Sequence, residues 1–217
     1  MLVGATICLQ ASAAHAVAVE VLTRAALGGT DFIDWGTLGV PFMHLSAPLT
    51  VLSSGGLSAT VSQPGDQELE RRDQTTGGWA GNFAPGDGLL WNGNRSATIS
   101  IAFATPVSGA GAQIQRDVFT PFTVTLTAFD PGGAALASFS RGGMSNTLGD
   151  NSAVFLGVIN DVANIARITY SVEDGLALNR LDLTTATAPT PVPEPGTLLL
   201  LATALTGAIA AGRRGRS

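Results

Sequence analysis

Short segments of alternating apolar and polar residues follow one another along most of this 217-residue chain. In segments 98–103, 122–127 and 167–172, large apolar side chains occupy every second position, with mostly threonine, serine or arginine between them. Segment 180–184 closes this series, and earlier candidates for the same pattern are 49–52, 57–61 and 111–115. Because successive side chains of a strand point to opposite faces, this period of two predicts β-strands with one buried face.

Turn-forming residues separate these segments. Ser-Gly-Gly stands at 54–56, Asp-Pro-Gly-Gly at 130–133, Gly-Asp-Asn at 149–151 and Asp-Gly at 174–175. No segment before residue 197 has a convincing helical pattern, and the charged run at 66–73 predicts a solvated loop or a short helical turn. Many short strands joined by glycine-rich turns predict an all-β body at 19–184, folded as an antiparallel β-sandwich.

The C-terminal segment 193–217 has three parts. Pro193-Glu194-Pro195 comes first, an uncharged apolar stretch without proline follows at 197–211, and Arg213, Arg214 and Arg216 come last. As a helix the stretch would be roughly 22–25 Å long, somewhat less than a hydrocarbon core of about 30 Å. We expect one transmembrane helix whose basic end stays in the cytoplasm. The alternative is a core helix at the end of a globular domain, which rarely lacks all charge.

This order of motif, apolar span and arginines resembles the PEP-CTERM sorting signal of Gram-negative bacteria that produce exopolysaccharide. The resemblance implies that an exosortase in the inner membrane recognises Pro193, Glu194 and Pro195, so these residues are a recognition site and not catalytic groups. Residues 185–192 alternate small residues with proline, which predicts a stiff, extended linker before the motif.

Residues 1–18 predict an export signal peptide. Residues 1–9 are apolar, and Ala14-His-Ala16 and Ala16-Val-Ala18 offer small-x-small cleavage sites. The first basic residue is Arg24, so the usual basic region is missing. We therefore expect that the true start lies upstream of Met1, or that the chain is a fragment.

Composition excludes several kinds of chemistry. Cys8 is the only cysteine, so the body has no thiol for nucleophilic catalysis, zinc ligation or an iron–sulfur cluster. The chain has 11 arginines, no lysine and 16 acidic residues, and loss of the tail arginines would make it more acidic still. A negative surface repels polyphosphate, so we expect no nucleic-acid partner.

Several body segments also resemble a known class. The runs at 122–130, 150–158, 165–172 and 178–182 are similar, in their order, to extracellular domains that precede PEP-CTERM signals. Those domains are jelly-roll sandwiches related to galactose-binding and carbohydrate-binding modules. The resemblance covers about residues 95–185; it implies a jelly-roll-like fold and carries over no ligand site.

Nothing in the sequence indicates catalysis. His44 is the single histidine after the predicted signal peptide, and no Gly-x-Ser-x-Gly motif is present. A glycosidase needs two facing carboxylates, and no feature of the sequence selects such a pair. We expect that the protein is not an enzyme.

Two ligand sites are candidates. Trp79, Asn82, Asp87 and Trp91 surround a Gly/Asn/Asp-rich loop, where tryptophan faces would stack on sugar rings and polar groups would bind hydroxyls. The alternative is that both tryptophans close the end of the sandwich. Turn residues Asp130, Asp150, Asn151, Glu173 and Asp174 are candidates for a structural Ca²⁺ ion, without the spacing of an EF-hand. No other cofactor is expected.

Two functions remain. The first is an exported, non-catalytic cell-surface or matrix protein that an exosortase sorts and that associates with exopolysaccharide. The second is an exported carbohydrate-binding module or glycan hydrolase. In both cases the expected partners are the exosortase and the inner membrane, and the expected destination is the surface or extracellular matrix of a Gram-negative bacterium.

Overall fold

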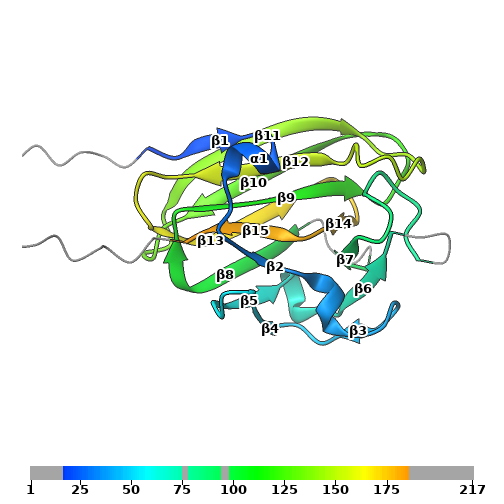
Figure 1. Ribbon diagram of the computed structural model, residues 1–217, viewed down its shortest axis with the longest axis horizontal. Helices are drawn as coiled ribbons and strands as arrows, with labels where there is room; N and C mark the ends of the chain where they lie inside the picture. The colour runs from blue at the N-terminus through cyan, green and yellow to red at the C-terminus, as the bar shows by residue number, and fades with distance from the viewer. Residues whose placement is uncertain (1–16, 75–77, 94–97, 186–217) are drawn as a thin grey trace, which may run out of the picture. The chain divides into compact units, whose positions relative to one another are not determined.

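Two antiparallel sheets form the body of the protein. The computed structural model describes residues 17–74, 78–93 and 98–185. Every pairing between its strands is antiparallel (Figure 1). The predicted antiparallel β-sandwich is therefore confirmed. Residues 1–16 and 186–217, which hold nearly all of the predicted signal peptide, linker and transmembrane helix, lie outside the described residues.

The larger sheet has nine strands. Seven form a continuous path and the other two extend it: β15 pairs with β9 and β2, and β2 pairs with β15. In path order the strands are β1 (Val19–Val21), β12 (Val154–Ile159), β9 (Gly109–Arg116), β14 (Leu176–Leu178), β7 (Gly88–Trp91), β6 (Leu69–Asp73) and β3 (His44–Leu45), with β15 (Leu181–Thr184) and β2 (Asp31–Ile33) beside them.

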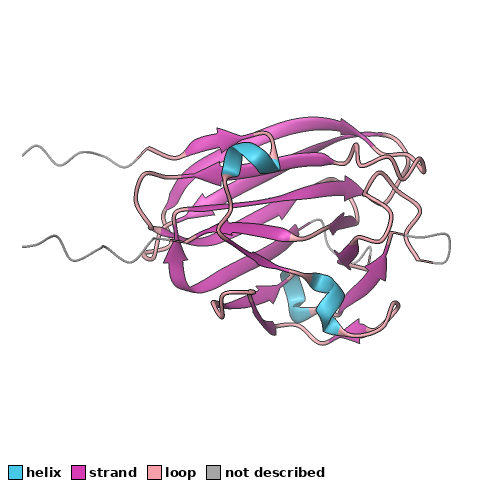
Figure 2. Ribbon diagram, viewed as in Figure 1, coloured by secondary structure: helices cyan, strands magenta, loops and turns pink. Residues whose placement is uncertain are grey.

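The smaller sheet has six strands, in the order β11 (Ala135–Met144), β10 (Pro121–Phe129), β13 (Ile165–Ser171), β8 (Thr98–Val107), β5 (Ser58–Ser62) and β4 (Leu49–Leu52). All but β11 were predicted, to within a residue or two, from the alternation of side chains, although β8 and β10 extend beyond the predicted segments. Helical structure is limited to α1 (Arg24–Leu27), η1 (Trp35–Leu38) and η2 (Pro64–Asp66) among the described residues (Figure 2).

The hydrophobic core lies between the two sheets. Alternate residues of β8, β10 and β13 contribute Ile101, Leu126 and Ile168, and those of β9 and β12 contribute Ile114 and Leu156. All five are fully buried. Burial of such side chains stabilises the fold by about 1.5–3 kcal/mol each.

One hydrogen bond joins the two sheets through the core. Tyr170 on β13 is fully buried, and its hydroxyl donates to the carbonyl oxygen of Leu156 on β12 at 2.9 Å. Burial raises the pKa of this phenol above its ordinary value. The hydroxyl therefore remains a neutral donor at every physiological pH.

The charged run at 66–73 corrects one prediction. Only its first residues are an exposed turn, whereas Leu69–Asp73 form β6 inside the larger sheet. Arg71 pairs with Asp73, and Arg72 pairs with Glu70. Because each charge has an opposite partner within the strand, the segment can be largely buried without isolated charges.

None of the helices in the described ranges has the length and hydropathy needed to span a membrane. The transmembrane helix predicted at 197–211 lies outside those ranges.

Candidate binding cleft

An open cleft of about 790 Å³ lies against the larger sheet, on the face away from the core. Its floor includes Gln113 of β9 and Phe155 of β12, whose neighbours Ile114 and Leu156 face the core. Residues of α1, β11 and the loops before β7, β12 and β15 form the walls. The cleft thus collects residues that are far apart in the sequence.

The sheet edge is open at the cleft. β1 pairs only with Gly157–Ile159 of β12, so the first half of β12 has no hydrogen-bonded partner strand on that side. Gly111 lies under the Phe155 ring, where a Cβ atom would be 2.7 Å from Cζ of Phe155. A glycine is required here because any side chain would push the aromatic floor outward.

The short helix α1 places an arginine over this floor. The Thr23 hydroxyl accepts a hydrogen bond from the Ala26 amide at 3.1 Å, and Gly28 ends the helix in the left-handed conformation. Leu27 is buried in a cluster with Val21 and Phe155. The chain is thereby fixed on the outer face of the sheet, where Arg24 lines the cleft.

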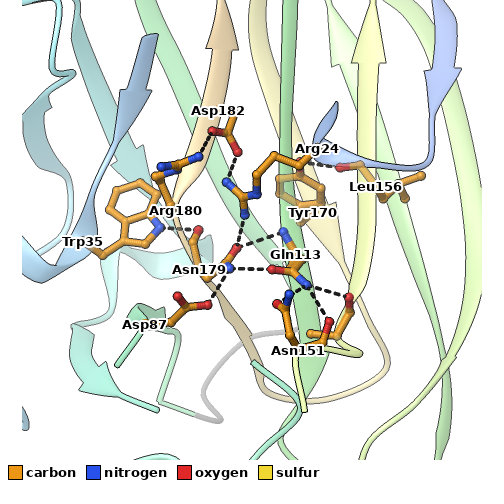
Figure 3. A network of polar contacts seen from close by, with 11 residues as sticks. Arg24, Trp35, Asp87, Gln113, Asn151, Leu156, Tyr170, Asn179, Arg180 and Asp182 are labelled. Carbon is orange, nitrogen blue, oxygen red and sulfur yellow. Dashed lines mark hydrogen bonds and ion pairs between the residues drawn. The ribbon is translucent and has the colours of Figure 1, made fainter. Parts of the chain in front are cut away.

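Asn179 is the centre of a polar network at the bottom of the cleft (Figure 3). Its side-chain amide donates to Asp87 at 2.8 Å and to the side-chain oxygen of Gln113 at 2.7 Å. Its side-chain oxygen accepts from Arg24 at 3.1 Å and from the Gln113 backbone amide at 3.0 Å, and its carbonyl oxygen accepts from the Trp35 indole at 2.8 Å. Every polar group of this buried side chain has a partner, so its orientation is fixed.

Gln113 extends the network toward the cleft rim. Its side-chain amide donates to Asn151 and to the carbonyl oxygen of Ala153, over distances of 3.0 to 3.2 Å. Asn151 has a φ of 63°, an uncommon value for a residue other than glycine. The contacts with Gln113 hold this loop, so amide groups of the cleft are preorganised.

A buried carboxylate holds two of the cleft arginines. Asp182 forms ion pairs with Arg24 and with Arg180, the latter at 2.8 Å (Figure 3). Burial raises the pKa of Asp182, although both guanidinium groups act in the opposite direction, and burial lowers the pKa of Arg24. The two arginines thus share one carboxylate.

The predicted sugar-binding residues fall into two places. Asp87 lines the cleft, whereas Asn82 is 1% exposed and bonds the Asn146 amide and the Ser152 hydroxyl, each at 2.8 Å. Trp79 is 5% exposed and meets Trp91 edge to face, with ring centroids 6.1 Å apart. The structure therefore brings the tryptophans together but separates them from Asp87 in the cleft.

The two tryptophans line a second, smaller pocket of about 160 Å³. The Arg72 guanidinium lies 4.5 Å from the centre of one Trp91 ring face, and the exposed Phe119 is also at the pocket. The Trp79 indole donates to Gln115 at 3.3 Å. Both tryptophans pack with Phe83 and neighbouring apolar residues, as expected of a structural plug, and their binding role stays a prediction.

The calcium candidates do not form one cluster. Strands β10, β11 and β13 alternate in direction, so Asp130 lies at the opposite end of the smaller sheet from Asp150, Glu173 and Asp174. Glu173 and Asp174 both pair with Arg116. No group of three or more histidine, cysteine or acidic residues suited to a metal occurs in the described part of the chain. The remaining candidate pair, Asp150 and Asn151, is untested.

Sequence reasoning missed most of the cleft. Arg24, Gln113, Arg141, Asn179 and Arg180 line it, yet none was predicted as a site residue. One signal was present: Asn179, Arg180 and Asp182 interrupt an otherwise apolar segment at 176–183. Polar residues inside a buried run indicate a polar network.

Comparison with known proteins identifies the C-terminal segment. Residues 191–216 match the PEP-CTERM protein-sorting motif. This match confirms the sorting signal predicted from the sequence, and it indicates an exported protein that is processed at a membrane. No curated protein matches the chain.

Three solved structures are distantly similar. The carbohydrate-binding module CsCBM6-3 from Clostridium stercorarium, solved with cellobiose, is 11% identical with a TM-score of 0.33, and the match covers 68% of this chain and 98% of that one. PfGH50B is 11% identical with a TM-score of 0.33, covering 74% of this chain and 24% of that one. A DUF4465 family protein from Bacteroides caccae is 12% identical with a TM-score of 0.26, covering 73% and 98%. Similarity at these TM-scores supports no assignment of function.

Proposed function

We propose that this chain is an exported, non-catalytic protein of the cell surface or matrix, which an exosortase sorts and whose body binds a saccharide in the cleft. The match of residues 191–216 to the sorting motif supports the proposal that an exosortase sorts the protein. The preorganised polar cleft on the larger sheet supports the proposal that the body binds a saccharide. The same proposal includes a Gram-negative source and association with the exopolysaccharide of that bacterium.

The proposed domain organisation gives each segment a task. Residues 1–18 direct export, 19–184 form the sandwich and 185–192 hold it away from the membrane. The exosortase recognises Pro193, Glu194 and Pro195, the following apolar stretch spans the inner membrane, and the tail arginines Arg213, Arg214 and Arg216 remain in the cytoplasm.

Cell fractionation with intact-mass analysis tests the sorting step. We expect the wild-type protein outside the inner membrane and trimmed near Pro195, and we expect a Glu194→Ala variant to stay full length in that membrane. Thr190→Ala, in the linker, is the control and should behave as wild type. Full-length, membrane-bound protein in all three strains would show that the segment is an ordinary anchor.

The cleft has the size and chemistry of a saccharide site. Its volume, about 790 Å³, is within the range of roughly 300–1,000 Å³ usual for small-molecule sites. The carboxylate of Asp87 and the side-chain amide of Asn151 offer acceptors and donors for sugar hydroxyls, and their contacts with Asn179 and Gln113 fix their positions. Fixed polar groups lose little conformational entropy on binding, which favours affinity.

The same cleft supports binding and not hydrolysis. Asp87 is the single carboxylate residue among those lining the cleft in the described chain. It accepts a hydrogen bond from Asn179 at 2.8 Å. The two-carboxylate mechanism of glycosidases needs a second acid across the scissile bond.

A second candidate saccharide site is the pocket between Trp79 and Trp91. The observation in its favour is the Trp91 indole nitrogen, which is buried and has no hydrogen-bonding partner among the described residues. A sugar hydroxyl entering the pocket of about 160 Å³ could accept from it.

Two blocking substitutions distinguish the pockets. Ala84 lines the cleft and Ala80 lines the tryptophan pocket, so Ala84→Trp fills one site and Ala80→Trp fills the other. Full-length protein in mild detergent is titrated calorimetrically with a panel of neutral and acidic oligosaccharides. We expect that Ala84→Trp abolishes binding and that Ala80→Trp does not. The reverse result would favour the tryptophan pocket, and no binding to any saccharide would contradict the binding proposal.

A further inference from the structure

We infer that the cleft selects saccharides that carry carboxylate groups, such as uronic acids, and that Arg141 is the residue that recognises the carboxylate. The inference rests on the proposed function, because it names the ligand class of the same cleft. It arises from the distribution of charge around the cleft.

Positive charge exceeds negative charge at this site. Arg24, Arg141 and Arg180 line the cleft, against Asp87 alone. Asp182 pairs with Arg24 and Arg180 from beneath, so even with this buried carboxylate included the arginines outnumber the acids. The whole chain has a formal charge of −5, so the local excess is not a consequence of overall composition. A cationic cleft in an anionic protein favours an anionic ligand.

Arg141 is the arginine that is available to a ligand. Its residue is exposed on β11, and no carboxylate in the described parts of the chain pairs with it. Arg24 and Arg180, in contrast, are held by Asp182, and Arg180 also stacks at 4.8 Å on Phe32. The unpaired guanidinium has all its donors free for an incoming group.

The position of Arg141 at the rim suits this task. β11 is the edge strand of the smaller sheet, and Arg141 and Gly142 both line the cleft that opens beside the unpaired first half of β12. Gly142 carries no side chain, which keeps the approach to the neighbouring guanidinium open. Asp87, which lines the cleft from the loop before β7, would repel a carboxylate and so favour its approach to Arg141.

The planar guanidinium favours a carboxylate over a neutral hydroxyl. Two parallel N–H groups of arginine match the two oxygens of a carboxylate, and such charge-assisted pairs are roughly twice as strong as neutral ones. The side-chain amide of Asn151, which Gln113 holds in place, remains for the ring hydroxyls. A uronic acid presents both kinds of group on one ring.

The test compares ligands that differ only in charge. Full-length protein in mild detergent is titrated with an oligogalacturonate and with the same oligosaccharide after methyl esterification, which removes the charge. We expect tighter binding of the acid form, and an affinity for it that falls with added salt. Arg141→Gln should weaken binding of the acid form about 10-fold or more and leave the ester nearly unchanged.

Arg167→Gln is the matched control, because Arg167 stacks on Phe129 of β10 and does not line the cleft. It should bind both ligands as wild type does. Equal affinity of the acid and ester forms, or no effect of Arg141→Gln, would overturn the inference while the saccharide proposal stands. Equal binding of a sulfated oligosaccharide would overturn the selectivity for carboxylate. Absence of binding to every saccharide would instead contradict the proposed function itself.

Discussion

Asp31 offers a sharp test of how the two sheets are held together. This buried carboxylate lies on β2 of the larger sheet and accepts hydrogen bonds from the turn between β4 and β5 of the smaller sheet. The Ser54 hydroxyl and the Gly55 amide each donate at 2.7 Å, as does the Phe32 amide, and the Ser53 hydroxyl donates to the second oxygen. We expect Asp31→Ala to remove this connection.

The expected cost follows from these contacts. Hydrogen bonds to a charged group contribute about 1.5–3 kcal/mol each. Ser54 and Gly55 are exposed and can bond water after the substitution, so the sum must be reduced. We expect Asp31→Ala to lower the free energy of unfolding by about 2–4 kcal/mol at pH 7. Urea denaturation of the full-length protein measures it, with the exposed Asp161→Ala as control.

The cost should also depend on pH. Burial alone would raise the pKa of Asp31, but the hydrogen bonds from Ser53, Ser54, Gly55 and Phe32 bring it below its ordinary value. A lowered pKa means that the stabilisation is present above the unfolded-state pKa of about 3.9 and is lost as pH falls through the folded-state value. The reasoning is refuted if Asp31→Ala costs less than about 1 kcal/mol at pH 7, or if its cost does not decrease in acid.

Four further predictions test the core and the two candidate ligand sites. Tyr170→Phe should lower the free energy of unfolding by about 1 kcal/mol in urea, because one buried hydrogen bond is lost. Gly111→Ala should cost about 1–3 kcal/mol in the same assay, since the new Cβ would be 2.7 Å from Phe155. Trp79→Ala should cost about 3–5 kcal/mol if the indole is mainly a structural plug, and a loss of saccharide binding without loss of stability would contradict that role. Added Ca²⁺ should raise the melting temperature of the wild type but not of Asp150→Ala if the predicted ion binds there; equal shifts would exclude this residue as a ligand.

The fold could be predicted because the alternation of apolar and polar residues appears within each single strand. In the central parts of β8, β10 and β13 large apolar residues face the core and the residues between them face away, so the sequence alternates as burial does. β6 could not be recognised in this way. Its buried Arg71 is tolerated because Asp73 pairs with it, and such pairing depends on the tertiary structure.

The cleft could not be predicted from the sequence, because it too depends on the tertiary structure. Its residues Arg24, Asp87, Gln113, Arg141 and Asn179 come from segments far apart in the chain. They meet because β9 lies between β12 on one side and β14 and β15 on the other, and because β11 reaches the same edge. Single-sequence periodicity carries no information about this order of strands. Asp87 was predicted from loop composition, but for a site that also held the two tryptophans.

Nuclear magnetic resonance of the side-chain amides and indoles tests the central claim most directly, because it reports where a saccharide binds. Isotope-labelled full-length protein is titrated with the oligosaccharide that binds most tightly in the panel. The cleft account predicts that the amide signals of Gln113, Asn151 and Asn179 shift with saturation, whereas that of Asn164, outside the cleft, stays unchanged. Shifts confined to the indole signals of Trp79 and Trp91 would contradict it and place the ligand in the tryptophan pocket.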